Sequence, residues 1–143
     1  MDFIEKKTPF DTIRYFTRTR PIIKKYEGEK YESKLLLDDN IDRKNFGGLR
    51  YKNFFKSSLK DKPLISIVTP NFKSPYLEKT IISILKQKYE NLELIIIDAD
   101  SGDETVQILK KYNDQIDLWV SEKDNGLWDG WNKGLEFANG DYI

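Results

Sequence analysis

The chain has 143 residues, enough for one domain with its own core, and its 38% hydrophobic and 34% charged residues are typical of globular proteins. Cysteine and histidine are absent, which excludes disulfides, thiol nucleophiles, imidazole bases and histidine-ligated zinc. Lysine and arginine together number 24, as do aspartate and glutamate, so the net charge gives no reason to expect nucleic acid as a partner.

The N-terminal part differs from the rest in charge. Residues 1–62 carry 16 lysines and arginines against ten acidic residues, whereas residues 63–143 carry eight against 14. We interpret residues 1–62 as a basic, aromatic-rich extension that packs on the domain as a solvated arm. Electrostatic contact with an anionic membrane face or a polyanionic acceptor is the alternative. A helix is expected around residues 12–26 with a break at Pro21, and Gly47-Gly48 is expected to form a turn.

No run of about 18 apolar residues predicts a membrane-spanning helix. The first eight residues carry charges where a signal peptide has an apolar stretch. The expected location is therefore the cytoplasm, with peripheral contact at the inner face of the cell membrane as a further expectation.

Apolar runs and helical stripes alternate from Pro63 onward. Residues 64–68 predict a buried strand that ends at Pro70. Ser74 and Pro75 predict the N-cap and the first residue of a helix. The apolar stripe of this helix consists of Leu77, Ile81, Ile84 and Leu85.

The same cycle then repeats. Residues 92–97 predict a second strand, and Ser101 with Glu104 fits a capping box at the start of a second helix. Its stripe consists of Thr105, Ile108, Leu109 and Tyr112. Residues 116–120 predict a third strand, and residues 141–143 predict the beginning of a fourth. A third helix between them is indicated by Trp128, Trp131, Leu135 and Ala138, with Gly140 at its end.

This alternation predicts an α/β fold for residues 63–143, a Rossmann-like parallel sheet with flanking helices, preceded by the N-terminal extension. Ligands of such sheets bind beyond the C-terminal ends of the strands. That rule points to residues 69–72, 98–101 and 122–126, which are largely polar or acidic.

Three side chains in these segments suit a nucleotide. Asp98 and Asp100 can accept hydrogen bonds from a base or a ribose, and the ring of Phe72 offers a face for stacking. The alternatives are that the two aspartates only cap the next helix and that Phe72 is a core residue. The sequence has no Gly-x-Gly-x-x-Gly after the first strand and no P-loop, which counts against dehydrogenases, P-loop enzymes and Rossmann-type switch domains.

Four segments in order resemble the family 2 glycosyltransferases of the GT-A fold, most closely the bacterial branch that makes surface polysaccharides. They are LISIVTPNF at residues 64–72, IIIDADSGDET at 95–105, SEKDNGLWDGWNKG at 121–134 and GDYI at 140–143. The last resembles the start of the strand that leads to the family's acidic metal-binding motif.

The resemblance implies transfer of a sugar from a nucleotide diphosphate donor, with a UDP-sugar as the default, to a saccharide or lipid-linked acceptor with inversion at the anomeric carbon. It places Pro70, Asn71 and Phe72 in the base pocket, Asp98, Asp100 and Ser101 on the base and ribose side, and Asp129 and Lys133 near the diphosphate. The alternative is a non-catalytic α/β module that binds a nucleotide or a partner.

The chain departs from the family pattern in several places. Ala99 stands where many relatives carry a second aspartate, Lys73 replaces a frequent asparagine, and Trp131 is a bulky residue for which the sequence offers no reason. The metal-binding acids and the catalytic base are expected beyond Ile143. No catalytic or metal-binding residue is therefore assigned, a divalent cation (Mg or Mn) is expected only in a full-length enzyme, and residues 1–143 alone are expected to be inactive.

Overall fold

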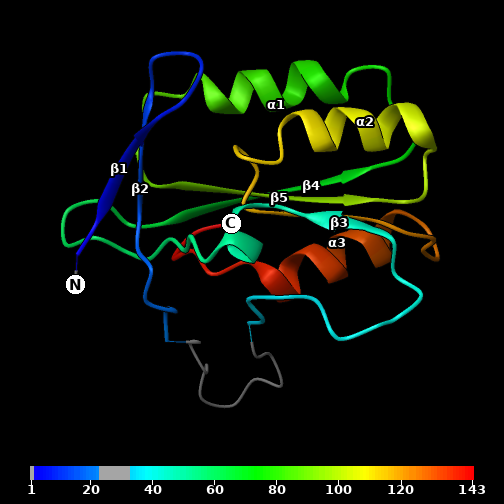
Figure 1. The fold of residues 1–143 in the computed structure, drawn as a ribbon, viewed down its shortest axis with the longest axis horizontal. Coiled ribbons are helices and arrows are strands. Elements are labelled where there is room, and N and C mark those ends of the chain that lie inside the picture. Colours follow the sequence, from blue (N-terminus) through cyan, green and yellow to red (C-terminus); the bar gives the residue numbers. More distant parts are fainter. Residues whose placement is uncertain (1, 23–32) are drawn as a thin grey trace.

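The computed structural model describes residues 2–22 and 33–143 (Figure 1). In chain order the elements are β1 (Ile4–Lys7), β2 (Ile13–Phe16), β3 (Asn45–Gly47), the 3₁₀ helix η1 (Leu49–Lys52), β4 (Ile65–Asn71), α1 (Leu77–Leu85), β5 (Leu92–Asp98), α2 (Asp103–Lys111), β6 (Leu118–Ser121) and α3 (Leu127–Phe137). Strands β1 and β2 form a separate antiparallel hairpin.

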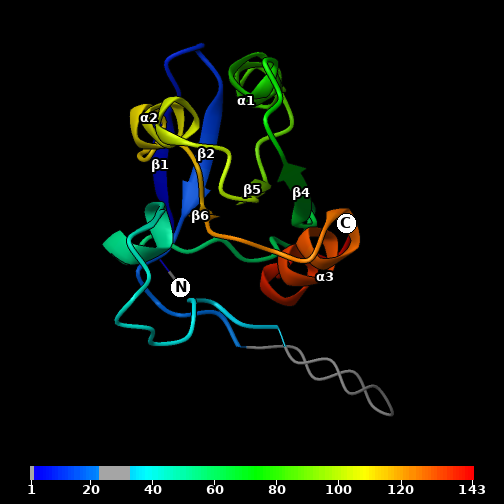
Figure 2. The same cartoon turned by 90° about the vertical axis from the view of Figure 1, so that its right-hand side faces the viewer.

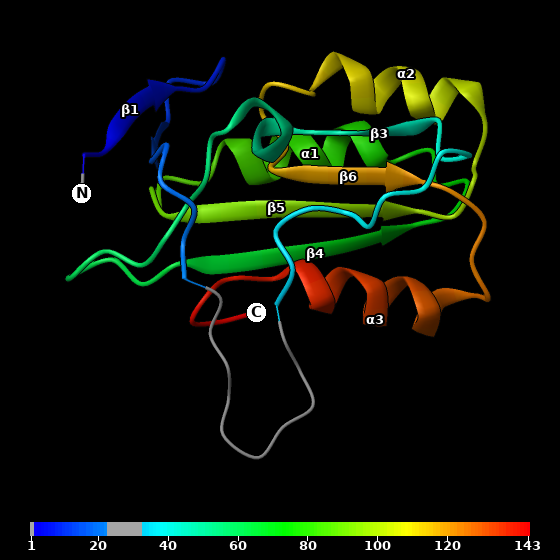
Figure 3. The ribbon, with the colours of Figure 1, turned by 60° about the horizontal axis from the view of Figure 1, so that its bottom comes forward.

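The main sheet has the strand order β3-β6-β5-β4 (Figure 3). Strands β4, β5 and β6 run parallel, which confirms the predicted α/β fold, while β3 is added to the edge antiparallel to β6. Helices α1 and α2 cover one face of this sheet and α3 covers the other (Figures 1 and 2). Every residue of β5 is buried because both faces of this central strand are covered, and its sequence is accordingly a nearly continuous apolar run.

The core consists of one apolar cluster on each face. On the α1–α2 face, residues of both helices pack on Leu94, Ile96 and Trp119. On the α3 face, Phe137 and Ala138 pack against β-strand residues that include Ile95 and Ile97. The alternation of Leu94 to Ile97 between the two clusters follows from the two-residue period of a strand.

Helix α3 lies very close to the sheet. A Cβ atom on Gly134 would lie 2.2 Å from Cγ1 of Val68, and one on Gly130 would lie 3.4 Å from Cβ of Pro70. The half-buried ring of Trp131 packs against the α3-face cluster, as does Leu37 from the N-terminal part of the chain. The Trp131 ring thus covers one side of the core, and this contact explains why a bulky residue is tolerated at position 131.

The N-terminal part is built into the domain, and three of its basic side chains are buried, Arg14, Arg50 and Lys56. The Arg50 guanidinium lies 2.9 Å from the Glu93 carboxylate, and the Lys56 ammonium lies 2.9 Å from that of Asp117. Gly48 connects β3 to η1 with a φ of +113°, and a Cβ there would lie 2.5 Å from the carbonyl oxygen of Asp117. The interpretation as a solvated arm is therefore wrong for Arg50 and Lys56, although the division at residue 62 stays a prediction.

The expected helix around residues 12–26 is also wrong where the structure describes it. Residues 13–16 form β2, and residues 23–26 lie outside the described residues. The burial of 13–16 alternates along the chain, which is the two-residue period of a strand with one covered face. Arg14 on this strand donates to the carbonyl oxygens of Ile84, Leu85 and Gln87 at the end of α1 and so fixes the hairpin to the domain.

Several expected boundaries shift, among them that of the third strand, β6, which begins at Leu118 instead of Ile116. Strand β4 continues through Pro70 to Asn71. An edge strand tolerates a proline, because the N–H that proline lacks is not needed for pairing on the open side of the strand. Helix α1 begins at Leu77 instead of Pro75. The Ser101 capping box is not formed, because Gly102 is the N-cap of α2 without a side-chain cap bond. The expected fourth strand is present as a single parallel bridge between Ile65 and Tyr142.

Candidate functional site

The C-terminal ends of β4, β5 and β6 meet at one edge of the sheet, where a cavity of about 430 Å³ opens. The end of β4, the turn after β5 and the loop between β6 and α3 form its walls. Its lining consists of Pro70, Asn71, Phe72, Ala99, Lys123, Asp124, Gly126 and Leu127. This is the edge to which the sequence rule for parallel sheets points.

Two apolar side chains in this cavity are not buried. Phe72 is 64% exposed and Leu127 is 60% exposed, so neither contributes to the core. Exposed apolar side chains beside a cavity are a typical feature of ligand sites, since a bound ring can cover them. The alternative that Phe72 is a core aromatic is thereby wrong.

Asp98 lies beneath the cavity and is completely buried. Its Oδ1 atom accepts hydrogen bonds from Asn71 Nδ2 at 2.7 Å and Ser101 Oγ at 2.6 Å. Its Oδ2 atom accepts from Ser121 Oγ at 2.7 Å and from the Ser101 backbone N–H at 3.0 Å. The carboxylate thus ties together the ends of all three parallel strands and fixes the side chain of Asn71 in the cavity wall.

Asp100 faces a neighbouring hollow. It is exposed, it has a φ of +54°, and it lines a space of about 330 Å³ that also involves Lys123. The opposite wall of this hollow comes from residues 40–45 of the N-terminal part. Lys123 borders both spaces, so the loop that follows β6 separates them.

A three-residue ion pair cluster holds this loop. Glu122 accepts from Arg43 Nε at 3.0 Å through one carboxylate oxygen and from Lys133 Nζ at 2.9 Å through the other. Burial raises the pKa of Glu122, but the hydrogen bonds from Arg43 and Lys133 outweigh burial and hold the pKa below its ordinary value. The carboxylate therefore stays ionised near neutral pH and links the N-terminal part, the loop and α3.

The eight site residues expected from the sequence are therefore distributed over several positions. Pro70, Asn71 and Phe72 line the cavity, and Asp98 and Ser101 support it from below. Asp100 lies at the adjacent hollow, and Lys133 pairs with Glu122. Asp129 accepts the backbone N–H of Asn125 at 3.0 Å, at the start of α3.

Sequence reasoning missed the contributions of Leu127 and Arg43. Leu127 could have been predicted from the sequence, because it follows a polar strand-end loop and begins a helix at the same edge. Arg43 could not, because the residue that it contacts, Glu122, is 79 positions away in the chain.

Comparison with known proteins identifies the family. The model of the family described as Glycosyl transferase family 2 matches residues 66–143. The chain belongs to glycosyltransferase family 2. This match contains nearly all of β4, the exposed Phe72 that follows it and the loop after β6. No solved structure matches the chain.

Curated relatives are bacterial glycosyltransferases. An uncharacterized glycosyltransferase of Haemophilus influenzae is 40% identical over 85 residues, which are 57% of this chain and 34% of that protein. The putative teichuronic acid biosynthesis glycosyltransferase TuaG of Bacillus subtilis is 37% identical over 86 residues, with the same shares. The Escherichia coli UDP-Glc:alpha-D-GlcNAc-diphosphoundecaprenol beta-1,3-glucosyltransferase WfgD is 34% identical over 85 residues, 58% of this chain and 34% of WfgD. The matched segment thus covers about a third of each relative's length.

Two further observations concern only residues 2–22 and 33–143. No helix there is long and apolar enough to cross a membrane. No group of three or more acidic, histidine or cysteine side chains there could hold a metal ion.

Proposed function

We propose that this chain binds the nucleotide of a nucleoside-diphosphate sugar in the cavity at the ends of β4 and β5, and that it forms the donor-binding part of an inverting glycosyltransferase of polysaccharide or glycan biosynthesis. The observation that carries this proposal is the exposed ring of Phe72 at a cavity within the family-matching segment. An aromatic ring that the fold leaves uncovered is available for stacking on a base.

Each lining group then has a distinct task. Phe72 and Leu127 cover the faces of the base, and Asn71 presents an amide whose orientation Asp98 fixes. All four hydrogen bonds to Asp98 come from protein groups, so we assign it a positioning role and no direct contact with the base. The Lys123 side chain is the cation at the cavity wall and is suited to a phosphate oxygen.

The names of the relatives suggest a donor and an acceptor. WfgD is named for a UDP-glucose donor and a diphosphoundecaprenol acceptor, and a relative from Campylobacter jejuni, 35% identical over 86 residues, is named for a PP-undecaprenol acceptor. We therefore propose a UDP-sugar as donor and a saccharide or lipid-linked acceptor, reached by peripheral contact with the membrane. That Asp100, Asp129 and Lys133 contact the donor stays a prediction.

A divalent cation is part of the proposal only for a longer enzyme. The described residues do not form a three-ligand acidic site, so they do not fit such an ion by themselves, and no step is assigned to it. When bound, a cation of this kind would neutralise charge on the leaving diphosphate. The expectation that residues 1–143 alone transfer no sugar also stays a prediction, which a transfer assay with UDP-sugars checks.

The testing experiment is thermal unfolding of the 143-residue chain with UDP, GDP and their sugars, each with and without Mn²⁺. A ligand that binds the native state raises the midpoint of unfolding. We expect one nucleotide to do so without metal, and the rise to disappear in Phe72→Ala. Phe46→Ala is the matched control, because Phe46 is an exposed aromatic on β3 that does not line the cavity.

A folded chain that responds to no nucleotide would exclude donor binding by these residues. It would favour the alternative of a non-catalytic module that binds a partner.

A further inference from the structure

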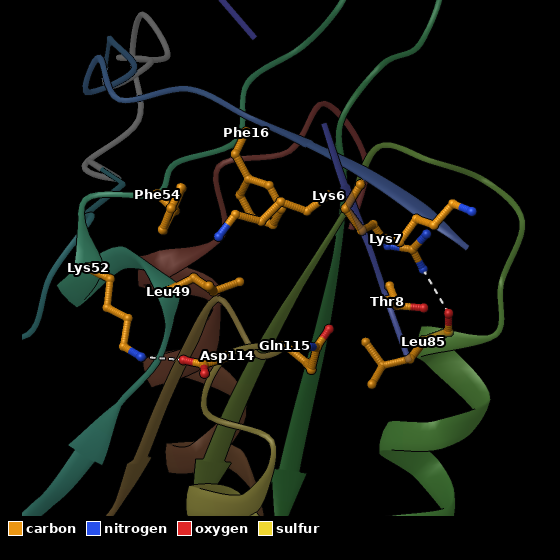
Figure 4. Close-up of a pocket in the computed structure, with 11 residues that line it drawn as sticks. Lys6, Lys7, Thr8, Phe16, Leu49, Lys52, Phe54, Leu85, Asp114 and Gln115 are labelled. Atoms are coloured by element: carbon orange, nitrogen blue, oxygen red, sulfur yellow. Dashed lines mark hydrogen bonds and ion pairs between the residues drawn. The ribbon is translucent and has the colours of Figure 1, made fainter. Parts of the chain in front are cut away.

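A second cavity lies at the opposite end of the sheet, where the parallel strands begin (Figure 4). It has a volume of about 300 Å³ and is enclosed by the β1–β2 hairpin, by η1 and by the segment before β6. The residues important here are Lys6, Lys7, Phe16, Leu49, Phe54 and Gln115. Apart from Gln115 they precede residue 66, so most of this cavity belongs to the part of the chain that the family model does not match.

The floor of this cavity is apolar. Phe16 and Leu49 are buried, and the rings of Phe16 and Phe54 meet edge to face with their centroids 5.7 Å apart. Leu85 at the end of α1 closes the other side and is buried as well. A ligand that reaches this floor therefore needs a small apolar portion.

The rim, in contrast, carries an excess of positive charge. The Lys6 ammonium lies 3.5 Å from the centre of the Phe54 ring, and the Arg18 guanidinium lies 3.7 Å from the centre of the same ring. Within residues 2–22 and 33–143, neither of these cations nor Lys7 has a carboxylate within ion-pair distance. Among the described residues, Lys52 is the one cationic residue of the lining with a carboxylate partner, Asp114.

Like charges gathered beside an apolar floor repel one another, and water screens them less there than at an open surface. An anion among them would relieve the repulsion. The half-buried amide of Gln115 has no hydrogen-bond partner in the described chain, and Figure 4 shows its side chain directed into the cavity. It can donate a hydrogen bond to an anionic oxygen.

We propose that this cavity is a binding site for a phosphate monoester with a small apolar group. Lys6 pairs with the phosphate, Gln115 donates to one of its oxygens, and the apolar group lies on Phe16 and Leu49. Lys7 follows Lys6 on β1, so its side chain lies on the opposite face of the hairpin. A phosphate monoester carries close to two negative charges at neutral pH, which matches Lys6 and Arg14, two cations of the lining that have no carboxylate partner among the described residues. The ligand is a free metabolite or the headgroup of a lipid, and both present this chemistry.

The site is independent of the proposed donor site, because the two cavities share no residue and lie at opposite ends of the sheet. Its test is isothermal titration of the 143-residue chain with phenyl phosphate and with inorganic phosphate. A parallel sedimentation assay uses phosphatidylcholine vesicles with and without phosphatidic acid. Neither measurement depends on nucleotide binding.

The variant is Lys6→Gln. The matched controls are Lys7→Gln, whose side chain lies on the opposite face of β1, and Lys60→Gln, an exposed lysine that does not line this cavity. We expect Lys6→Gln to weaken binding of phenyl phosphate by about tenfold and each control to change it by less than about twofold.

Binding of phosphatidic acid vesicles with the same variant pattern, but no binding of phenyl phosphate, would support the lipid headgroup as the source. The proposal is overturned if the wild-type chain binds neither probe. It is equally overturned if Lys7→Gln or Lys60→Gln weakens binding as much as Lys6→Gln, because binding would then reflect only the general positive charge of the N-terminal part.

Discussion

The buried pair of Arg50 and Glu93 yields the sharpest prediction about stability. Their side chains are only 3% and 1% exposed. Arg50 donates to Glu93 and to the backbone oxygens of Phe137 and Leu35, while Glu93 also accepts from the Asn139 backbone N–H at 2.6 Å. Replacing Arg50 with methionine would leave a buried carboxylate and several carbonyl oxygens without this donor.

Removal of one partner of a buried ion pair costs about 3–5 kcal/mol. The free energy of unfolding of a whole domain is only about 5–15 kcal/mol. We therefore expect Arg50→Met to lose a large share of the stability. Lys52→Met on the same 3₁₀ helix is the matched control, because Lys52 and Asp114 are 49% and 69% exposed. An exposed pair of this kind contributes only about 0–1 kcal/mol.

Urea unfolding followed by circular dichroism measures both effects, and Glu93→Gln together with the double variant Arg50→Met, Glu93→Gln completes a double-mutant cycle. The double variant should be more stable than Arg50→Met alone, because it no longer buries an unpaired charge. Equal, small losses for Arg50→Met and Lys52→Met would refute the reasoning. They would mean that residues 33–62 contribute little to folding of the domain.

Two further predictions concern the other close contacts. Gly134→Ala should destabilise the chain by about 1–3 kcal/mol, since the new methyl group would overlap a stiff valine side chain on β4. Asn132→Ala, on the exposed side of α3, should not destabilise it and serves as the control. Thermal unfolding compares the two variants, and equal midpoints would contradict the packing of α3. Arg43→Gln should raise the pKa of Glu122 toward its ordinary value of 4.5. Because a depressed carboxylate pKa stabilises the folded state above the unfolded-state pKa, the stability lost in Arg43→Gln should be greatest near neutral pH and should shrink as the pH falls below about 4.5. Urea unfolding at several pH values tests this, and a loss that does not change with pH would contradict it.

The sequence predicted the parallel part of the fold because its signals are local. The apolar run of β5 and the stripe of α1 each lie within a few residues of chain, and the strand-end rule then located Phe72 at the cavity. The boundaries were less accurate, since Ser101 uses its hydroxyl for the Asp98 network instead of a helix cap.

The N-terminal part could not be predicted in the same way. Strand β3 has three residues, and its place in the sheet depends on pairing with β6, more than 70 positions away. The burial of Arg50 depends on Glu93, 43 positions away, and a lone arginine in a basic segment carries no sign of such a partner. Because long-range ion pairs of this kind bury its basic side chains, the segment that was expected to be a surface arm is part of the domain.

The central claim is that a nucleotide occupies the cavity at the ends of β4 and β5, and a titration of the ¹⁵N-labelled chain with UDP, followed by NMR, tests it most directly. We predict that the largest shift changes occur at the amides of residues 71–72, 99–101 and 123–127, and that residues 6–8 and 49–54 at the opposite end change little. Changes centred on the opposite end of the sheet, or none at saturating UDP and GDP, would contradict the claim.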